Sequence, residues 1–262
     1  MAEVKITFDA ADDYERYMGR WSRAIGERFL AWLDAAKSAR WLDVGCGTGA
    51  FSELILRHCA PASLNGIDPS PEQIEYARKQ LPDLTFQVAD SMNLPFGESE
   101  FDVVASALVI HFIPDRARAF AEMYRVLRPG GLVGGYTWKR NAAANSAPYA
   151  PMLRAVQSIG GETVTSPLVP ESAAEGMRAT LAAAGFTDIA VTEIEVTRTF
   201  ANFDEYWEIQ AMPFSPSGKT VAKLTDAQRA RLRDVMRETL PAAADGSIAY
   251  AATAMAGKAR KA

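Results

Sequence analysis

The stretch Trp41-Leu42-Asp43-Val44-Gly45-Cys46-Gly47-Thr48-Gly49 decides the fold of this 262-residue chain. Residues 41–44 are mostly apolar, which predicts a short buried strand, and residues 50–56 take up a helical rhythm. The three alternate glycines between them allow positive φ and carry no Cβ that would keep a ligand away from the backbone. The start of the helix also leaves backbone N–H groups free at the positive end of its dipole. A strand, a glycine-rich turn and a helix in this order predict a site for the polar end of a nucleotide-like cofactor.

Composition excludes several classes of partner. Hydrophobic residues make up 48% of the chain and charged residues 23%, and the formal net charge is −4. An acidic balance gives no basic field for nucleic acid or an anionic membrane. No stretch approaches the roughly 20 apolar residues of a membrane span, and the polar N-terminus lacks the apolar core of a signal peptide. We therefore expect no nucleic-acid binding and no stable insertion into a membrane.

The cysteines and histidines point to a cytoplasmic protein without a bound metal. Cys46 and Cys59 give no disulfide framework, which fits a reducing compartment. His58 and His111 have no spacing that resembles a zinc site. A monomer and a homodimer are both compatible with the sequence.

The glycine turn fits two cofactors. Gly45, Gly47 and Ala50 satisfy the dinucleotide fingerprint G-x-G-x-x-G/A, and Asp68 lies at about the right distance for a ribose contact. Here, however, the turn is compressed to G-x-G-x-G and follows Leu-Asp-Val. In this form it resembles the first motif of class I S-adenosylmethionine (SAM) methyltransferases. The methionyl end of SAM is a small zwitterion, so it needs a tight backbone loop rather than a cradle for pyrophosphate.

Later motifs follow the methyltransferase order. The run Arg-Val-Leu-Arg-Pro-Gly-Gly at residues 125–131 resembles the family and places proline and glycine just beyond a helix end. The resemblance is close over residues 40–140, and it favours the type-11 group, similar to the methyltransferases of ubiquinone and menaquinone biosynthesis. A dinucleotide-binding oxidoreductase stays the alternative, although the chain contains no Tyr-x-x-x-Lys pair.

The predicted fold class is α/β, a Rossmann-like doubly wound sheet. It has seven mostly parallel strands with helices on both faces, an antiparallel last strand and a helical N-terminal cap. The strands are expected at residues 41–44, 63–68, 84–89, 101–106, 132–138, 188–200 and 248–258, and residues 214–218 are expected to form a loop. We expect one domain over residues 1–262, divided into a cap at 12–35, a cofactor-binding core at 40–140 and acceptor-side helices with the last two strands at 141–262.

The resemblance implies a set of cofactor contacts. Asp68 ends a strand, where its carboxylate could accept both ribose hydroxyl hydrogens; it could instead cap a turn. Asp90 would accept from the adenine amino group and Met92 would cover the purine face, unless they are a turn aspartate and a core methionine. The implied contacts in the core are Asp43, Gly45, Cys46, Gly47, Asp68, Pro69, Ser70, Asp90, Ser91, Met92, Ala107 and Leu108.

The region before the first strand carries aromatic and methionine side chains at helical spacing, with a break expected at Gly19 or Gly26. Its order Tyr-Glu-Arg-Tyr-Met-Gly-Arg-Trp-Ser resembles the N-terminal cap of the type-11 group. The segment is either an amphipathic helix packed on the sheet or a lid over the cofactor. As a lid it would contact the cofactor through Tyr14, Tyr17, Arg20 and Trp21.

The expected reaction is direct in-line transfer of the SAM methyl group to a small molecule, leaving S-adenosylhomocysteine. His111 follows the fourth strand, where the family places the methyl group, and it could act as a general base; the alternative is a packed, hydrogen-bonded side chain. The acceptor pocket should come from the cap and residues 141–170 and 203–214, whose aromatic and methionine content suggests a partly apolar acceptor. A protein that holds SAM without catalysing transfer stays the third hypothesis.

Overall fold

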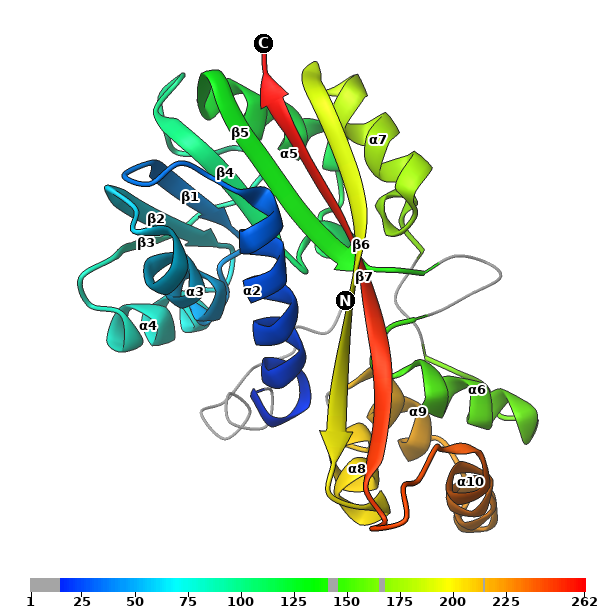
Figure 1. The fold of residues 1–262 in the computed structure, drawn as a ribbon. Helices are drawn as coiled ribbons and strands as arrows, with labels where there is room; N and C mark the ends of the chain where they lie inside the picture. Colours follow the sequence, from blue (N-terminus) through cyan, green and yellow to red (C-terminus); the bar gives the residue numbers. More distant parts are fainter. Residues whose placement is uncertain (1–14, 141–145, 165–167, 214) are drawn as a thin grey trace. The chain divides into compact units, whose positions relative to one another are not determined.

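The computed structural model describes residues 15–140, 146–164, 168–213 and 215–262 (Figure 1). The chain forms two compact units. We call the first the sheet unit: it comprises Ser22–Ala144, Leu168–Ile194 and Thr253–Ala262. We call the second the helical unit: it comprises Met1–Trp21, Asn145–Pro167 and Glu195–Ala252. That residues 1–262 form a single functional domain stays a prediction.

Seven strands form one sheet in the order β3-β2-β1-β4-β5-β7-β6. Their bounds are Arg40–Val44 (β1), Ser63–Asp68 (β2), Thr85–Val88 (β3), Phe101–Ala107 (β4), Leu127–Trp138 (β5), Phe186–Phe200 (β6) and Ile248–Lys261 (β7). The first five strands pair in parallel, and β7 runs antiparallel to β5. This confirms the predicted sheet, including its antiparallel last strand.

The strand order reverses at β1, which lies between β2 and β4. In Figure 1, β2 and β3 extend from one side of β1, and β4 and β5 extend from the other. The chain therefore runs from β1 and from β4 to strands on opposite sides, and such a switch point is where open α/β sheets bind ligands. The glycine turn follows β1 directly, so it lies at this point.

Helices cover both faces of the sheet unit. Successive residues of a strand point to opposite faces of the sheet. Two neighbouring residues of β5 therefore identify the helices that cover each face. Val133 shares an apolar cluster with Phe120 of α5 (Arg116–Val126) and Met177 of α7 (Ala174–Ala183). On the other face, a Cβ at Gly134 would meet Leu33 of α2 (Arg20–Leu33) at 2.6 Å. The prediction of helices on both faces is confirmed.

Side-chain caps begin several helices where the sequence indicates them. Ser70 accepts a hydrogen bond from the Gln73 N–H at 3.3 Å, and Pro71 is the first residue of α4 (Pro71–Gln80). Before α10 (Asp226–Thr239), Thr225 and Gln228 form a reciprocal capping box. Caps of this kind satisfy N–H groups that the first helical turn cannot pair.

One predicted loop is a helix. The loop is expected over residues 214–218, but α9 spans Pro216–Ala222, and Phe214 lies outside the described residues. Ser215 accepts from the Gly218 N–H at 2.8 Å, and Pro216 occupies the first helical position. A serine followed by proline can begin either a helix or a turn. In the folded chain, packing against distant residues selects the helix.

One boundary agrees with the prediction and one differs from it. The N-terminal helical region breaks at Gly19, where a π-helical turn, Glu15–Gly19, passes into α2. Strand β5 begins at Leu127 rather than Leu132, because Leu127 already pairs with Phe101 before the register shifts. The helix nevertheless stops at Val126 as expected.

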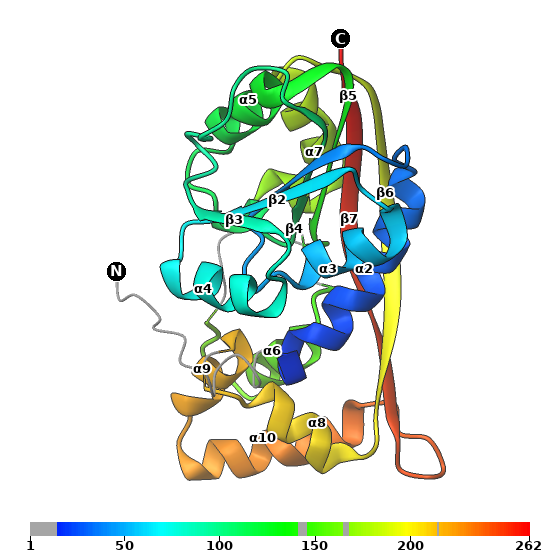
Figure 2. The same cartoon turned by 90° about the vertical axis from the view of Figure 1, so that its left-hand side faces the viewer.

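The helical unit is built from short helices around the ends of β6 and β7. These helices are α6 (Ala150–Ser158), α8 (Phe203–Gln210), α9 and α10. Figure 2 shows α8 and α10 next to the strand ends, and α6 contacts both α9 and α10. Buried Tyr206, Leu232 and Met236 give this unit an apolar interior of its own.

We predict that Gly176→Ala destabilises the protein although alanine is the better helix former. Gly176 lies in α7, and an added Cβ would overlap the backbone carbonyl of Pro170. Forced repacking of this kind costs about 1–3 kcal/mol, which exceeds the helix-propensity gain of about 1 kcal/mol. Urea unfolding of the variant should show the loss.

Gly26→Ala is the matched control. Gly26 lies in α2, and its added Cβ would approach the end of the Leu54 side chain at 2.6 Å, with Phe51 and Tyr136 at ordinary contact distances of 3.4 and 3.5 Å. The Leu54 side chain can turn aside, so we expect a smaller effect than at Gly176. Equal destabilisation of the two variants would contradict the assigned packing of α7.

Candidate functional site

The glycine turn has the backbone geometry that only glycine adopts easily. Gly45, Gly47 and Gly49 have φ values of 77°, 54° and 89°, in the left-handed region where a Cβ is disfavoured. The Gly45 and Cys46 N–H groups both donate to the Ile67 carbonyl, at 2.8 and 2.9 Å. These two hydrogen bonds fix the turn to the carboxyl end of β2.

Asp68 joins two loops at the carboxyl edge of the sheet. Its Oδ2 atom accepts from the Gly47 N–H at 3.1 Å, and its Oδ1 atom accepts from the Ser70 N–H at 2.9 Å. The side chain is only 8% exposed, and burial raises its pKa while the two N–H groups oppose that shift. Asp68 thus acts as a turn anchor. Each oxygen keeps a second lone pair, so a ribose contact stays a prediction; Pro69, beside it, is exposed.

The segment after β4 packs directly against the glycine turn. A Cβ at Gly45 would lie 2.5 Å from Cγ1 of Val109. Ala107 pairs with Tyr136 of β5, and the Leu108 N–H donates to the Tyr136 carbonyl at 2.9 Å. Leu108 has a φ of 59°, a strained conformation of a kind that is concentrated at functional sites. The structure therefore brings the loops after β1, β2 and β4 together.

Asp90 shapes its own turn at the same edge. Its Oδ1 atom accepts from the Met92 N–H at 2.8 Å, while the Met92 carbonyl accepts from Arg118 Nε at 2.8 Å. Asp90 is exposed, and Ser91 and Met92 are half-buried. This is the turn aspartate that the sequence left open; contacts of Asp90, Ser91 and Met92 with adenine stay predictions.

Asp43 is a fully buried carboxyl beneath the turn. Its Oδ2 atom accepts from the Ser52 hydroxyl at 2.7 Å, and its Oδ1 atom has no partner among the described residues. Burial raises the pKa of Asp43 to about 7, and the negative charge of Asp68 adds to the rise. Cys46 is also buried, and burial raises the pKa of its thiol. Both residues stay predicted contacts of the cofactor.

His111 is better suited to packing than to catalysis. It lies on a short 3-10 helix, Ile110–Phe112, with Nδ1 3.2 Å from Thr137 Oγ1. Burial, followed by the charge of Arg140, lowers the pKa of His111 to about 4. The imidazole is therefore neutral at pH 7 and a weak base, which favours the packed alternative. Its role as a general base stays a prediction.

Of the predicted cap residues, Tyr17, Arg20 and Trp21 lie in the helical unit. Tyr17 and Trp21 are buried, 3% and 1% exposed, and Arg20 is exposed. Trp21 packs on Tyr250 with ring centroids 5.3 Å apart. Tyr14 lies outside the described residues. Contacts of these four residues with the cofactor stay predictions.

Sequence reasoning missed three side chains around the glycine turn. Val109 covers Gly45, Ser52 bonds to Asp43, and Gln73 Oε1 lies 2.7 Å from the position of a Cβ at Gly47. Ser52 is the one with a sequence signal, because it is a polar residue on the buried face of α3 (Ala50–Cys59). Nothing local marks Val109 or Gln73, since their proximity depends on the strand order.

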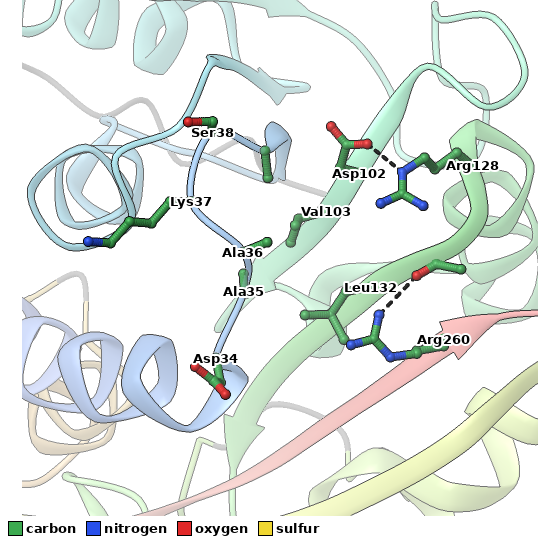
Figure 3. Close-up of a pocket in the computed structure, with 12 residues that line it drawn as sticks. Asp34, Ala35, Ala36, Lys37, Ser38, Asp102, Val103, Arg128, Leu132 and Arg260 are labelled. Carbon is green, nitrogen blue, oxygen red and sulfur yellow. Dashed lines mark hydrogen bonds and ion pairs between the residues drawn. The ribbon is translucent and has the colours of Figure 1, made fainter.

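A cavity of about 240 Å³ lies at the opposite, amino edge of the sheet unit. Figure 3 shows Arg128 directed at Asp102 and Arg260 directed at a backbone carbonyl, which is that of Gly130. Asp102 also accepts from Arg40, and these arginines hold its pKa well below the usual range. Asp102 is thus paired within the protein, and ligands of such sheets bind at the other edge. The cavity is therefore not the cofactor site.

The described residues contain neither a cluster suited to a metal ion nor a helix long and apolar enough to cross a membrane.

We predict that Asp43→Asn removes a pH dependence of stability. The folded protein keeps a proton on Asp43 up to about pH 7, whereas the unfolded chain releases it near its ordinary value of 3.8. The contribution of Asp43 to stability should therefore fall as pH rises from about 4 to about 7. Urea unfolding should show the variant to be more stable than wild type at pH 8, by on the order of 2–4 kcal/mol.

That advantage should shrink at pH 5, because the wild-type carboxyl is then protonated in the folded state. The asparagine side chain of the variant keeps an acceptor for Ser52, so the packing is conserved. Asp34→Asn, at an exposed position, serves as the control and should show the same small difference at both pH values. A pH-independent effect of Asp43→Asn would contradict a buried, protonated carboxyl.

Comparison with known proteins agrees with this geometry. Residues 42–134 match the family model of a methyltransferase domain of the type-11 group. The chain is 32% identical over 163 residues to the malonyl-[acyl-carrier protein] O-methyltransferase of Pectobacterium atrosepticum, covering 62% of this chain and 61% of that protein. It is 44% identical over 94 residues to a phthiotriol/phenolphthiotriol dimycocerosates methyltransferase of Mycobacterium leprae, covering 35% of each. The chain thus spans less than two thirds of these relatives.

A solved structure shares the fold. Phosphoethanolamine N-methyltransferase 2 of Haemonchus contortus, in complex with SAM, superposes with a TM-score of 0.59 at 20% identity, covering 98% of this chain and 58% of that one. The region that matches the family model contains the glycine turn, Asp68, Asp90 and the segment after β4 described above. The comparisons therefore support a methyltransferase domain of the SAM-dependent class I, type-11 group, matched over residues 42–134.

Proposed function

We propose that this protein transfers a methyl group from SAM to a small-molecule acceptor by direct in-line displacement and releases S-adenosylhomocysteine. The observation that carries the proposal is the bare glycine turn, whose Gly47 N–H is held by the Asp68 carboxylate at the switch point of the sheet. The matching family and the relatives named methyltransferases support the same reaction. Neither the dinucleotide-dependent oxidoreductase nor the non-catalytic SAM-binding protein gains support from a feature of the site.

The residues at the carboxyl edge fit SAM. Gly45 and Gly47 carry no side chain of their own, and Asp43 keeps one buried oxygen without a partner among the described residues. We propose that the turn holds the amino-acid end, Asp68 the ribose, and Asp90 and Met92 the adenine. When bound, SAM supplies a sulfonium methyl group that is already a strong electrophile.

The protein then has to orient the acceptor and exclude water. Orientation alone can contribute on the order of 7–11 kcal/mol to catalysis. With a pKa of about 4, His111 is a poor proton acceptor for a phenol or an alcohol. We therefore propose an acceptor that presents its nucleophilic atom already deprotonated or as a free lone pair.

Two finer features belong to the same proposal. The aromatic interior of the helical unit supports a partly apolar acceptor, because aromatic rings line most pockets for small organic molecules. The two cysteines, Cys46 and Cys59, are free and buried, which supports a reducing, cytoplasmic location.

We predict that Gly47→Ala raises the Kd for SAM at least about tenfold, because the new Cβ is strained at a φ of 54° and meets Gln73 Oε1 at 2.7 Å, which would displace the turn proposed to hold the amino-acid end. Isothermal titration with SAM measures this. Gly130→Ala is the matched control: Gly130 also has a positive φ, 71°, but lies on the amino edge of the sheet. Unchanged affinity in folded Gly47→Ala, or equal loss in both variants, would remove the turn from the site.

Transfer itself is tested by incubating the protein with methyl-labelled SAM and a small-molecule metabolite extract. The proposal expects label in a small-molecule product. Binding of SAM without transfer would support the non-catalytic hypothesis instead. Stabilisation by NAD, by about 2.7 kcal/mol at 100 times its Kd, with none by SAM, would support the oxidoreductase.

A further inference from the structure

The helical unit contains a dense aromatic cluster. Tyr250 lies at its centre: its ring centroid is 5.3 Å from Trp21, 5.9 Å from Tyr206 and 5.8 Å from Phe200. Phe200 also contacts Tyr206 at 5.2 Å, and the guanidinium carbon of Arg198 lies 4.5 Å from the centroid of the Phe200 ring. Trp21 thus borders Tyr250, Arg198 borders Phe200, and Tyr206 borders both of these stacked rings.

Most polar groups inside this cluster are paired. The Tyr250 hydroxyl donates to the Pro148 carbonyl and accepts from Gln210 Nε2 at 3.2 Å. The amide oxygen of Gln210 accepts from Ser217 at 3.4 Å. This interior is therefore built to satisfy buried polar groups, as native interiors generally are.

Three buried polar groups are exceptions. Trp21 Nε1, Arg198 Nε and the Tyr206 hydroxyl have no hydrogen-bond partner within the described ranges. Their residues are 1%, 6% and 0% exposed, so bulk water does not solvate these atoms. The indole and guanidinium nitrogens can only donate, and the tyrosine hydroxyl can also donate. Leaving such groups unpaired is costly, which makes a bound acceptor atom the natural explanation.

The charge of this region favours an anion. Arg198 donates from Nη1 to the Tyr17 carbonyl at 3.0 Å, a neutral partner that leaves its charge unbalanced. It forms no ion pair with a carboxylate in the described part of the chain, although Glu205 contributes favourably from a distance. Burial, together with Arg20 and Arg16, lowers the pKa of Arg198. A buried cation without a paired anion is destabilising, and a bound anion would offset that cost.

We propose that Trp21, Arg198 and Tyr206 form the recognition site for the methyl acceptor, and that the acceptor is an organic anion whose carboxylate or ionised hydroxyl receives their hydrogen bonds. The inference rests on the proposed function and names the substrate class. Phe200 and Tyr250 would pack against an apolar or aromatic body of the acceptor. An anionic acceptor also agrees with a reaction that uses no general base.

A pair of tyrosine variants tests whether the unpaired groups are reserved for a ligand. Tyr206→Phe and Tyr250→Phe each remove one buried hydroxyl from the same cluster. The Tyr250 hydroxyl is paired within the protein, so its loss should lower the Tm by about 2–4 °C. The Tyr206 hydroxyl is not, so we expect Tyr206→Phe to leave the Tm unchanged or raise it. Equal destabilisation by both variants would overturn the assignment of Tyr206.

The acceptor class is tested by separating a metabolite extract on an anion-exchange column before the reaction. Each fraction is then incubated with the protein and methyl-labelled SAM. The inference expects the label to be transferred to compounds of the anionic fraction. Transfer to the unretained neutral and cationic fraction alone would overturn the inference and leave the proposed function intact.

The three donors are then tested on the active fraction. Arg198→Met and Tyr206→Phe should lower kcat/KM for that fraction by about 10- to 100-fold, as expected for a lost hydrogen bond to a charged group. Arg198→Lys should recover part of this loss, and the Kd for SAM should stay at its wild-type value in folded variants. Wild-type turnover in both Tyr206→Phe and Arg198→Met would refute the site. SAM binding without label in any fraction would instead refute the proposed function, and the inference with it.

Discussion

The geometry of the cofactor edge depends on one carboxylate that accepts two backbone N–H groups. Asp68 bonds to Gly47 after β1 and to Ser70 after β2. Glycine loses more conformational freedom on folding than any other residue, so a turn with three glycines is not rigid by itself. The two hydrogen bonds to Asp68 hold it in place. The Ile67 carbonyl adds a second tie through Gly45 and Cys46. The glycine turn can therefore keep its shape at the switch point, with Val109 and Gln73 packed beside it.

The same edge places two buried carboxyl groups, those of Asp43 and Asp68, beneath the turn. Asp43 and Asp68 are close enough for the charge of Asp68 to raise the pKa of Asp43, and both are shielded from water. A cation above the turn would relieve this repulsion and favour the ionised form of Asp43. SAM carries a sulfonium, an ammonium and a carboxylate group and is positive overall, whereas NAD brings a negatively charged pyrophosphate. The electrostatics of the turn thus favour the same cofactor as its shape.

A feature of the structure could be predicted when neighbouring residues in the sequence encode it. It could not be predicted when it depends on packing between distant parts of the chain. The strand bounds around the glycine turn are right because buried parallel strands, capping residues and left-handed glycines are each encoded within a few residues. The prediction for the Ser215-Pro216 segment is wrong because the same residues start a turn or a helix, and distant packing selects between them. Val109 and Gln73 are missed because only the strand order brings them to the turn.

The acceptor side is less predictable for a further reason. Aromatic content indicates a partly apolar pocket, yet no spacing relates Trp21, Arg198 and Tyr206, which come from three elements of the chain. Recognition of the donor depends on backbone groups, whose positions a short motif can specify. Recognition of an acceptor depends on side chains whose meeting point only the tertiary structure determines. A sequence can therefore identify the methyl donor while leaving the acceptor open. In this chain, the constraint on the acceptor comes from the buried polar atoms that have no partner among the described residues of the helical unit.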